Sequence, residues 1–94
     1  MIYTKATQYS INPEKLKGFI DYLYIFTQKA RMCETNLSFE YGLLSHENII
    51  VVERWTTRSE FENFIKIPGF AKEIETIEKM SKNVKVLYEL DLNR

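Results

Sequence analysis

The sequence predicts a single α+β domain of the ferredoxin-like class, a sandwich in which helices cover one face of a four-stranded antiparallel sheet. Strand and helix patterns follow one another in the order β-α-β-β-α-β, which is typical of that fold. The chain has 94 residues, which is enough for one domain and not for two. Because no linker, repeat or low-complexity segment divides it, we expect residues 1–94 to form one domain.

The first strand is expected from Ile2 to Tyr9, with Tyr3, Thr7 and Tyr9 on one face. Asn12-Pro13-Glu14 predicts a helix start, because Asn is a good N-cap and Pro is tolerated in the first turn. Apolar residues then recur at helical spacing and predict a helix from about Pro13 to Met32: Leu16, Phe19, Ile20, Leu23, Phe26 and Ala30.

Two strands joined by a polar hairpin come next. The second strand is expected from Asn36 to Leu44, and the third from Ile49 to Trp55. The run Ile49 to Val52 is apolar on both faces, as expected of a central strand. On the second strand, alternation assigns four large residues to one face: Leu37, Phe39, Tyr41 and Leu43.

A second helical region and a last strand complete the pattern. Thr57-x-x-Glu60 is a capping box that predicts a helix start, with Phe61, Phe64 and Ile65 on its apolar face. Pro68-Gly69 interrupts this helix. A further helical stretch and a strand from Val84 to Leu92 follow; the inward residues of that stretch are Phe70, Ile74, Ile77 and Met80.

Helices on one face leave the opposite face of the sheet uncovered. Neither face is uniformly polar, because one offers Tyr3, Thr7 and Tyr9 and the other carries Ile50 and Val52. Exposed apolar faces of that size usually meet a partner. We therefore expect a homodimer in which the two sheets pack face to face.

Composition excludes several classes of function. Thirteen basic and thirteen acidic residues give a net charge of zero, which argues against nucleic acid as a partner. No apolar stretch approaches the length of a membrane span, and the N-terminus does not read as a signal peptide. Cys33 is the single cysteine, which fits a reducing compartment. These features predict a cytoplasmic protein without membrane contact.

The sequence gives little support for a metal-binding site, a nucleophilic catalytic residue or a phosphate-binding loop. One His and one Cys give no zinc-binding spacing, so no metal site is predicted. His46 falls in the predicted hairpin and is interpreted as a solvated loop residue. Cys33 falls at the end of the first helix, where the helix dipole disfavours a thiolate, and is interpreted as structural. The three glycines are far apart, so no phosphate-binding loop exists.

One local pattern is a candidate binding site. Glu53 and Trp55 share a face of the third strand, and Phe61 and Phe64 come from the helix that follows. These residues, with polar groups from Thr7, Asn36 or Ser38, predict a flat apolar cavity suited to a planar ligand. The alternative interpretation is that the rings are simply core.

Four short segments between residues 37 and 70 carry a family resemblance, in this order: Leu37-Ser38-Phe39-Glu40, Glu53-Arg54-Trp55, Ser59-Glu60-Phe61 and Ile67-Pro68-Gly69-Phe70. The sequence resembles the antibiotic biosynthesis monooxygenase family of dimeric α/β-barrel domains. The resemblance implies a homodimer whose two sheets form a barrel. It also implies oxygenation of quinols or phenols without flavin or metal, in which the substrate itself reduces oxygen and the pocket deprotonates and orients it.

The chain departs from the family pattern at three places. Phe64 stands where many members carry a histidine, so the base such a histidine supplies is missing. Glu34-Thr35-Asn36 replaces a Gly-Cys or Pro-Gly pair before the second strand. Haem-degrading relatives use an Asn, a Trp and a His. This chain has Thr7 or Gln8 near the position of the Asn. It has Phe64 and Ile74 at the positions of the Trp and the His, so an axial haem ligand is absent.

Two functional hypotheses follow. The first is a monooxygenase that needs no cofactor and oxidises a small aromatic or quinol substrate with molecular oxygen. Trp55 and Phe64 would sandwich the ring, and Glu53 and Tyr9 are the catalytic candidates, with Tyr3 or a water as other sources of a base. The second is a non-catalytic dimeric ligand-binding or stress-response domain on the same fold. A haem-handling protein ranks below both.

Overall fold

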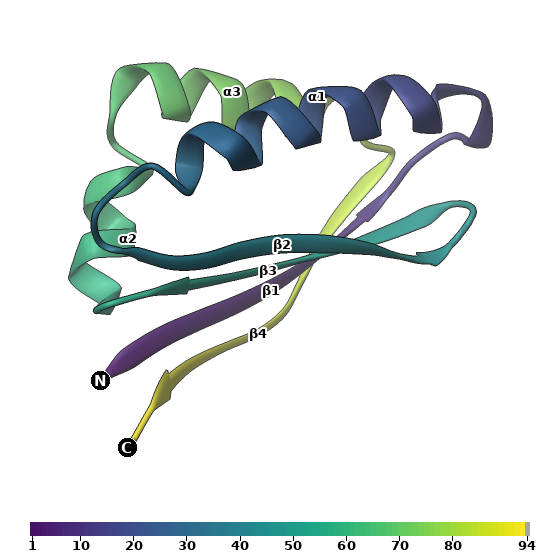
Figure 1. The fold of residues 1–94 in the computed structure, drawn as a ribbon. Helices are drawn as coiled ribbons and strands as arrows, with labels where there is room; N and C mark the ends of the chain where they lie inside the picture. Colours follow the sequence, from purple (N-terminus) through teal and green to yellow (C-terminus); the bar gives the residue numbers. More distant parts are fainter. Residues whose placement is uncertain (94) are drawn as a thin grey trace.

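The computed structural model describes residues 1–93 and contains one four-stranded antiparallel sheet with helices on one of its faces (Figure 1). The strand order is β2-β3-β1-β4, and the element order confirms the predicted ferredoxin-like α+β arrangement. The elements are β1 Ile2–Ser10, the 3-10 turn η1 Pro13–Lys15, α1 Leu16–Ala30, β2 Asn36–Ser45, β3 Asn48–Trp55, α2 Arg58–Phe64, α3 Pro68–Lys79 and β4 Asn83–Leu92.

The first helix begins and ends differently from the sequence expectation. Pro13 opens a 3-10 turn, and the α-helix begins only at Leu16. Asn12 occupies the N-cap position, but its side chain makes no capping hydrogen bond; its backbone carbonyl accepts from the N–H of Lys15 instead. The helix ends at Ala30 and not at Met32. Its apolar stripe is buried as predicted, with Phe19, Leu23, Phe26 and Ala30 in the core.

The two central strands, β1 and β3, place their side chains in register. Tyr3 lies opposite Trp55, Thr7 opposite Val51 and Tyr9 opposite Ile49, all on the face that the helices cover. The alternate residues of β3, Ile50 and Val52, therefore point to the other face. The apolar run of β3 has the central position that the sequence predicts.

Strand β2 contains an irregularity that the sequence analysis did not foresee. Asn36 lies opposite Trp55 and Ser38 opposite Arg54, so the pairing skips Leu37. The expectation that Leu37 shares a face with Phe39 is therefore wrong: Leu37 is 50% exposed and lines a hollow on the uncovered face, whereas Phe39 is buried under the helices. A β-bulge adds one residue to one strand and breaks the alternation of faces there.

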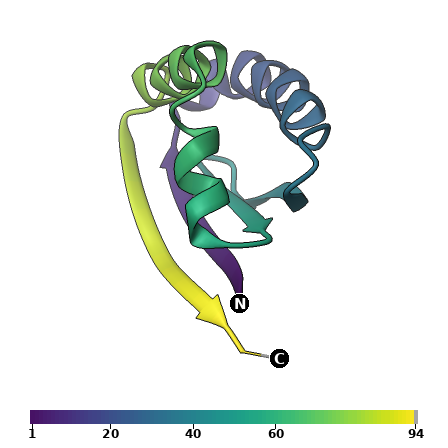
Figure 2. The same ribbon diagram turned by 90° about the vertical axis from the view of Figure 1, so that its left-hand side faces the viewer.

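The second helical region is two helices, as the sequence predicts. The Thr57 hydroxyl accepts a hydrogen bond from the N–H of Glu60 over 3.2 Å and caps α2. Ile67 is extended, and Pro68 then begins α3 at the first helical position, where its missing N–H costs nothing. Figure 2 shows α2 beside the end of the sheet, with α1 and α3 above it. No helix within residues 1–93 is long and apolar enough to cross a membrane.

Candidate functional site

A small cavity lies between the helix-covered face of the sheet and the three α-helices. Its volume is about 90 Å³. That is room for a few water molecules or one small ring, and it is below the roughly 300 Å³ at which pockets for drug-sized ligands begin. Its walls combine an apolar lining with five polar residues. The apolar side chains include Leu23, Phe26, Phe39, Val51, Phe61, Phe64, Ile74 and Val84, and the polar ones are Lys5, Thr7, Tyr9, Glu53 and Glu78.

The cavity opens between α2, α3 and β4. Ile65, at the end of α2, is 37% exposed, and Val86 of β4 is 47% exposed. Glu78 of α3 is exposed as well. All three side chains line the cavity, so they form the rim through which solvent or a ligand enters.

Glu53 is the one carboxylate deep in this cavity, and Trp55 fixes its position. The indole Nε1 of Trp55 donates a hydrogen bond to Glu53 Oε1 over 2.9 Å. The two residues share the inward face of β3, and both are buried. Among residues 1–93, Oε2 of Glu53 has no hydrogen-bond partner. One carboxylate oxygen is thus held in place while the other remains available to a ligand.

Burial makes Glu53 a weaker acid than an ordinary glutamate. Desolvation raises its pKa to about 6, and this effect exceeds the opposing effects of the Trp55 hydrogen bond and the nearby Lys5 charge. A carboxylate with a pKa of about 6 is mostly ionised at neutral pH yet basic enough to accept a proton. That combination suits a general base.

Tyr9 has the opposite character. Burial, together with the charges of Glu53 and Glu78, raises the pKa of its hydroxyl above the usual value of 10. Its ring packs on Phe19 with 5.8 Å between centroids. Tyr9 therefore stays protonated and offers the cavity a hydrogen-bond donor, so of the two predicted catalytic candidates only Glu53 has the properties of a base.

Phe64 joins the cavity wall to the aromatic core. Its ring centroid lies 4.5 Å from that of Trp55 and 4.6 Å from that of Phe70, and Phe26 and Phe39 also pack around it. Phe64 is buried and lines the cavity at the same time. The two interpretations of these rings, core or cavity wall, therefore both apply to this residue.

The structure brings together most of the predicted site residues. Glu53, Tyr9, Thr7, Phe61 and Phe64 line the cavity. Trp55 lies behind it, fully buried, and contacts Phe64 and Glu53; it is not among the lining residues and does not face Phe64 across a gap.

Asn36 and Ser38 do not line the cavity, and their prediction as polar wall groups is wrong. The bulge at Leu37 explains this placement. The Asn36 side-chain amide donates to the backbone carbonyls of Ser38 and Arg54, each over 3.1 Å, and so is used in stabilising the bulge. Ser38 lies opposite Arg54 and lines a hollow on the other face of the sheet.

Lys5 and Glu78 line the cavity and were missed by the sequence analysis. Lys5 lies directly opposite Glu53 in the antiparallel register of β1 and β3. Opposite charges facing each other across paired strands attract, but this pairing depends on the β1–β3 register, which the pattern of one strand does not contain. Glu78 follows Ile77, the inward residue of α3, and reaches the rim from the helix edge.

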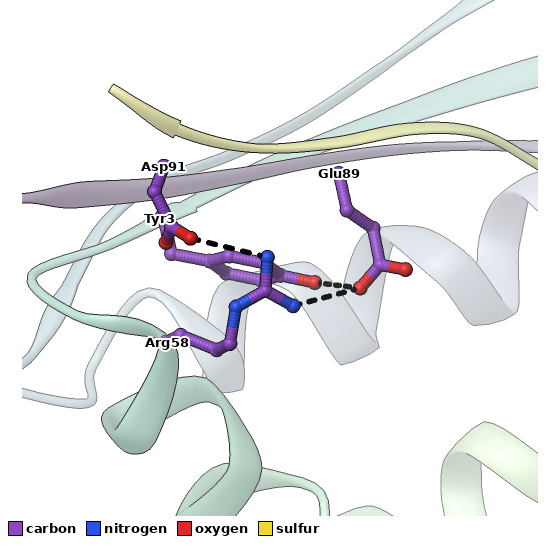
Figure 3. Close-up of polar contacts among 4 residues, drawn as sticks. All are labelled: Tyr3, Arg58, Glu89 and Asp91. Atoms are coloured by element: carbon purple, nitrogen blue, oxygen red, sulfur yellow. Dashed lines mark hydrogen bonds and ion pairs between the residues drawn. The ribbon is translucent and has the colours of Figure 1, made fainter. Parts of the chain in front are cut away.

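A polar cluster closes the end of the sheet next to α2 (Figure 3). The hydroxyl of the buried Tyr3 donates to Glu89 Oε1 over 2.5 Å. Arg58, the first residue of α2, lies over the Tyr3 ring at 4.6 Å and forms ion pairs with Glu89 at 3.5 Å and Asp91 at 3.3 Å. Burial and the bond to Glu89 raise the pKa of the Tyr3 hydroxyl. Tyr3 of β1 therefore contacts both β4 and α2 and holds these elements together, and it does not act as a base.

Other chemistry-bearing residues lie away from the cavity. His46 is exposed at the β2–β3 turn, and Cys33 is half-buried after α1, where burial raises the pKa of its thiol. No group of three or more His, Cys, Asp or Glu side chains within residues 1–93 is arranged to hold a metal ion.

Comparisons with solved structures agree on the fold. A solved antibiotic biosynthesis monooxygenase superposes with a TM-score of 0.84 at 15% identity, over all of both chains. A Deinococcus radiodurans protein, named as a candidate member of the same class, gives the same TM-score and identity over 100% of this chain and 94% of that one. Rv0793 from Mycobacterium tuberculosis gives 0.80 at 13% identity over all of both chains. This chain therefore has the fold of the antibiotic biosynthesis monooxygenases. No protein-family model matches the sequence, and no curated protein matches it.

Proposed function

We propose that this chain is a cofactor-independent monooxygenase that oxidises a single-ring phenol or hydroquinone with molecular oxygen. The observation that carries the proposal is the state of Glu53. It is a buried carboxylate with a pKa of about 6, it is oriented by the Trp55 indole at 2.9 Å, and it faces an apolar cavity. Perturbed acidity and a fixed geometry in a cleft are characteristic of a catalytic base. Glu53 would thereby supply the base that a histidine supplies in many members of the family, at the position where this chain has Phe64.

The proposed reaction begins with proton transfer from the substrate hydroxyl to Glu53. The resulting phenolate is electron-rich and passes electrons to oxygen. One oxygen atom bonds to a ring carbon, and the other leaves as water after the O–O bond breaks. A phenol with a free para position gives a quinone, so the substrate supplies all four electrons that oxygen takes up. No external reductant is needed. The apolar wall of Phe61 and Phe64 excludes water from the intermediate.

Cavity size restricts the substrate. A volume of about 90 Å³ matches one ring with small substituents and is too small for a naphthoquinol or a haem. The rim residues Ile65 and Val86 are partly exposed, so a substituent of the ring has an exit to solvent on that side. We therefore expect benzene-ring substrates to be preferred over two-ring substrates.

Oxygen uptake tests the proposal. The purified protein is given catechol, resorcinol, hydroquinone and a naphthoquinol, each corrected for autoxidation. Uptake is expected with at least one single-ring compound, and ¹⁸O₂ should place one labelled atom in the product and one in water. Glu53→Gln should lower the enzymatic rate by roughly 10²- to 10⁴-fold, since a general base contributes that much. The control is Glu62→Gln, which changes an exposed glutamate of α2.

Three outcomes contradict the proposal. Uptake at the autoxidation rate with every compound would remove the oxygenase function. Uptake without incorporation of label would mean that the protein acts as an oxidase, which reduces oxygen to peroxide or water and does not oxygenate the substrate. Equal rates for Glu53→Gln and wild type would remove Glu53 as the base.

A ligand-binding domain without catalysis is the second candidate, and the small cavity volume favours it. A site of about 90 Å³ has room for one small apolar molecule and little space for a second reactant beside it. This candidate predicts that single-ring compounds bind and raise the melting temperature, while oxygen uptake stays at background.

We also propose that two copies associate through the sheet face that no helix covers. Ile50 and Val52 lie on that face, and Tyr88 and Leu90 of β4 remain 41% and 47% exposed there. An open apolar hollow of about 680 Å³ runs over β2 and β3. Light scattering after size exclusion should give twice the 11.2 kDa monomer mass. Val52→Lys should give the monomer mass, whereas the exposed Tyr24→Lys on α1 should not.

A further inference from the structure

Lys5 occupies a central place in the candidate site. It is in the middle of β1, directly opposite Glu53 of β3 and Glu89 of β4. Its side chain lines the cavity, and its Nζ lies 4.9 Å from the centroid of the Phe61 ring. Among the lining residues within the described part of the chain, it is the one cation. A lysine at such a position places positive charge where a ligand would lie.

The ammonium group of Lys5 is not committed to another residue. Across residues 1–93 it forms no ion pair within 4.0 Å, although two carboxylates flank it. Glu89 is held by the Tyr3 hydroxyl and by Arg58, and Oε1 of Glu53 is held by the Trp55 indole. A half-buried cation over an aromatic ring has lost part of its hydration and gains most from a nearby anion.

We propose that Lys5 is the anion-binding group of the cavity and holds the oxygen atom of a phenolic ligand in its ionised form. This inference deepens the proposed function and rests on it, because it takes the cavity as the substrate site. In the proton transfer, the ligand O–H bond breaks and an O–H bond forms on the carboxylate of Glu53. The electron pair stays on the ligand oxygen, whose new negative charge then lies near the Lys5 ammonium. The total charge of the site is unchanged.

Without a cation this transfer would be strongly unfavourable. An ordinary phenol has a pKa near 10, about four units above that of Glu53, which corresponds to a factor of about 10⁴ against transfer. The other charged groups at the cavity, Glu53 and Glu78, are both acidic, and the Tyr9 hydroxyl is neutral. Lys5 is therefore the group that offsets the negative charge on the ligand. A fixed cation aimed at developing charge is an effective electrostatic stabiliser.

Ligand binding by an inert phenol tests the inference without relying on oxidation. The probes are 4-nitrophenol, whose neutral and ionised forms absorb at different wavelengths, and nitrobenzene, which has no hydroxyl. Wild-type protein at pH 7 should bind 4-nitrophenol as the phenolate and at least tenfold more tightly than nitrobenzene. Lys5→Met should lower this preference at least tenfold and Lys5→Arg should retain it. The control Lys15→Met, at an exposed lysine, should match wild type.

The charge preference separates a binding role from a structural one, since misfolding weakens binding of both probes alike. The inference is overturned if Lys5→Met keeps the preference for 4-nitrophenol. It is also overturned if the wild-type protein binds 4-nitrophenol in its neutral form, or if it binds neither 4-nitrophenol nor nitrobenzene. Either result would count whatever the Lys5 variants do. A Lys5-dependent preference without oxygen uptake on electron-rich phenols would remove the oxygenase and leave the anion site standing. If the wild type takes up oxygen and Lys5→Met keeps the preference for 4-nitrophenol over nitrobenzene, only the proposal that Lys5 binds the anion is rejected.

Discussion

Trp55 and Glu53 form a buried hydrogen-bonded pair in which the indole Nε1 lies 2.9 Å from Oε1 of the carboxylate. They are two residues apart on the same face of β3, so the strand itself sets their geometry. Trp55 is the single tryptophan of the chain, and Glu53 changes charge near pH 6. The indole is therefore a built-in reporter of the proposed base.

We predict that the fluorescence of Trp55 titrates with a midpoint near pH 6. Protonation of Glu53 removes the negative charge next to the indole N–H and alters its emission. Emission is recorded from pH 4.5 to 8 in folded protein, with circular dichroism at each pH. Glu53→Gln should flatten the curve, while Glu62→Gln at an exposed position of α2 should leave it unchanged. A flat wild-type curve would show that Glu53 does not titrate in this range.

We predict that Glu53→Gln stabilises the fold at high pH. The folded-state pKa of about 6 lies above the ordinary value of 4.5, so the native state binds more protons than the unfolded state between these values. The cost of the buried charge is absent below about pH 4.5, grows through this window, and reaches about 2 kcal/mol above it. Because Gln keeps an acceptor for the Trp55 indole, it removes the cost without breaking that hydrogen bond.

Urea denaturation of wild type and Glu53→Gln at pH 4.5 and pH 8 measures this difference. The variant should gain about 2 kcal/mol relative to wild type between the two pH values. An equal pH dependence for the two proteins would mean that Glu53 is not the group whose ionisation costs stability.

Periodicity and capping signals predicted most of the fold. The alternation in β1, the Thr57 cap and the Pro68 start of α3 are local features, and each acts as the sequence indicates. The proximity of Glu53, Trp55, Phe61 and Phe64 also followed from local spacing, because one strand and the next helix supply all four residues.

The parts that were missed depend on pairing between strands. The bulge at Leu37 is set by how β2 aligns with β3, and it moves Asn36 and Ser38 out of the site. The position of Lys5 next to Glu53 is likewise a property of the β1–β3 register. Single-strand alternation does not contain this register, which is why the polar side of the cavity was harder to predict than its aromatic wall.

We predict that Phe64→Ala both destabilises the protein and enlarges the cavity. Phe64 packs against four rings and is buried, so its truncation should cost about 3–5 kcal/mol. Phe70→Ala is the matched control, because this residue is in the same cluster but only half-buried, and its loss should be smaller. Urea denaturation measures both. If Phe64→Ala cost no more than Phe70→Ala, the ring stack would not be a main support of the core.

We predict that Tyr3 and Glu89 are energetically coupled and that acid weakens the coupling. The Tyr3 hydroxyl donates to Glu89 Oε1 over 2.5 Å, and this bond is the first cause of the lowered pKa of Glu89. A lowered carboxylate pKa contributes stability above the ordinary value of 4.5, and that stability is lost as the pH falls below it. Since Glu89 is partly exposed, we expect a coupling of about 1 kcal/mol, below the roughly 1.5–3 kcal/mol of buried hydrogen bonds to charged groups.

A double-mutant cycle with Tyr3→Phe and Glu89→Gln measures this coupling by urea denaturation at pH 7 and at pH 3.5. Tyr3→Phe keeps the ring under Arg58, so the cycle removes the hydroxyl bond while the cation–π contact at 4.6 Å remains. The expected result is a coupling at pH 7 that shrinks at pH 3.5, where Glu89 is increasingly protonated. A coupling that is equal at both pH values would show that the bond does not depend on the charge of Glu89. A coupling of zero at pH 7 would mean that the hydrogen bond from Tyr3 in β1 to Glu89 in β4 does not stabilise the fold.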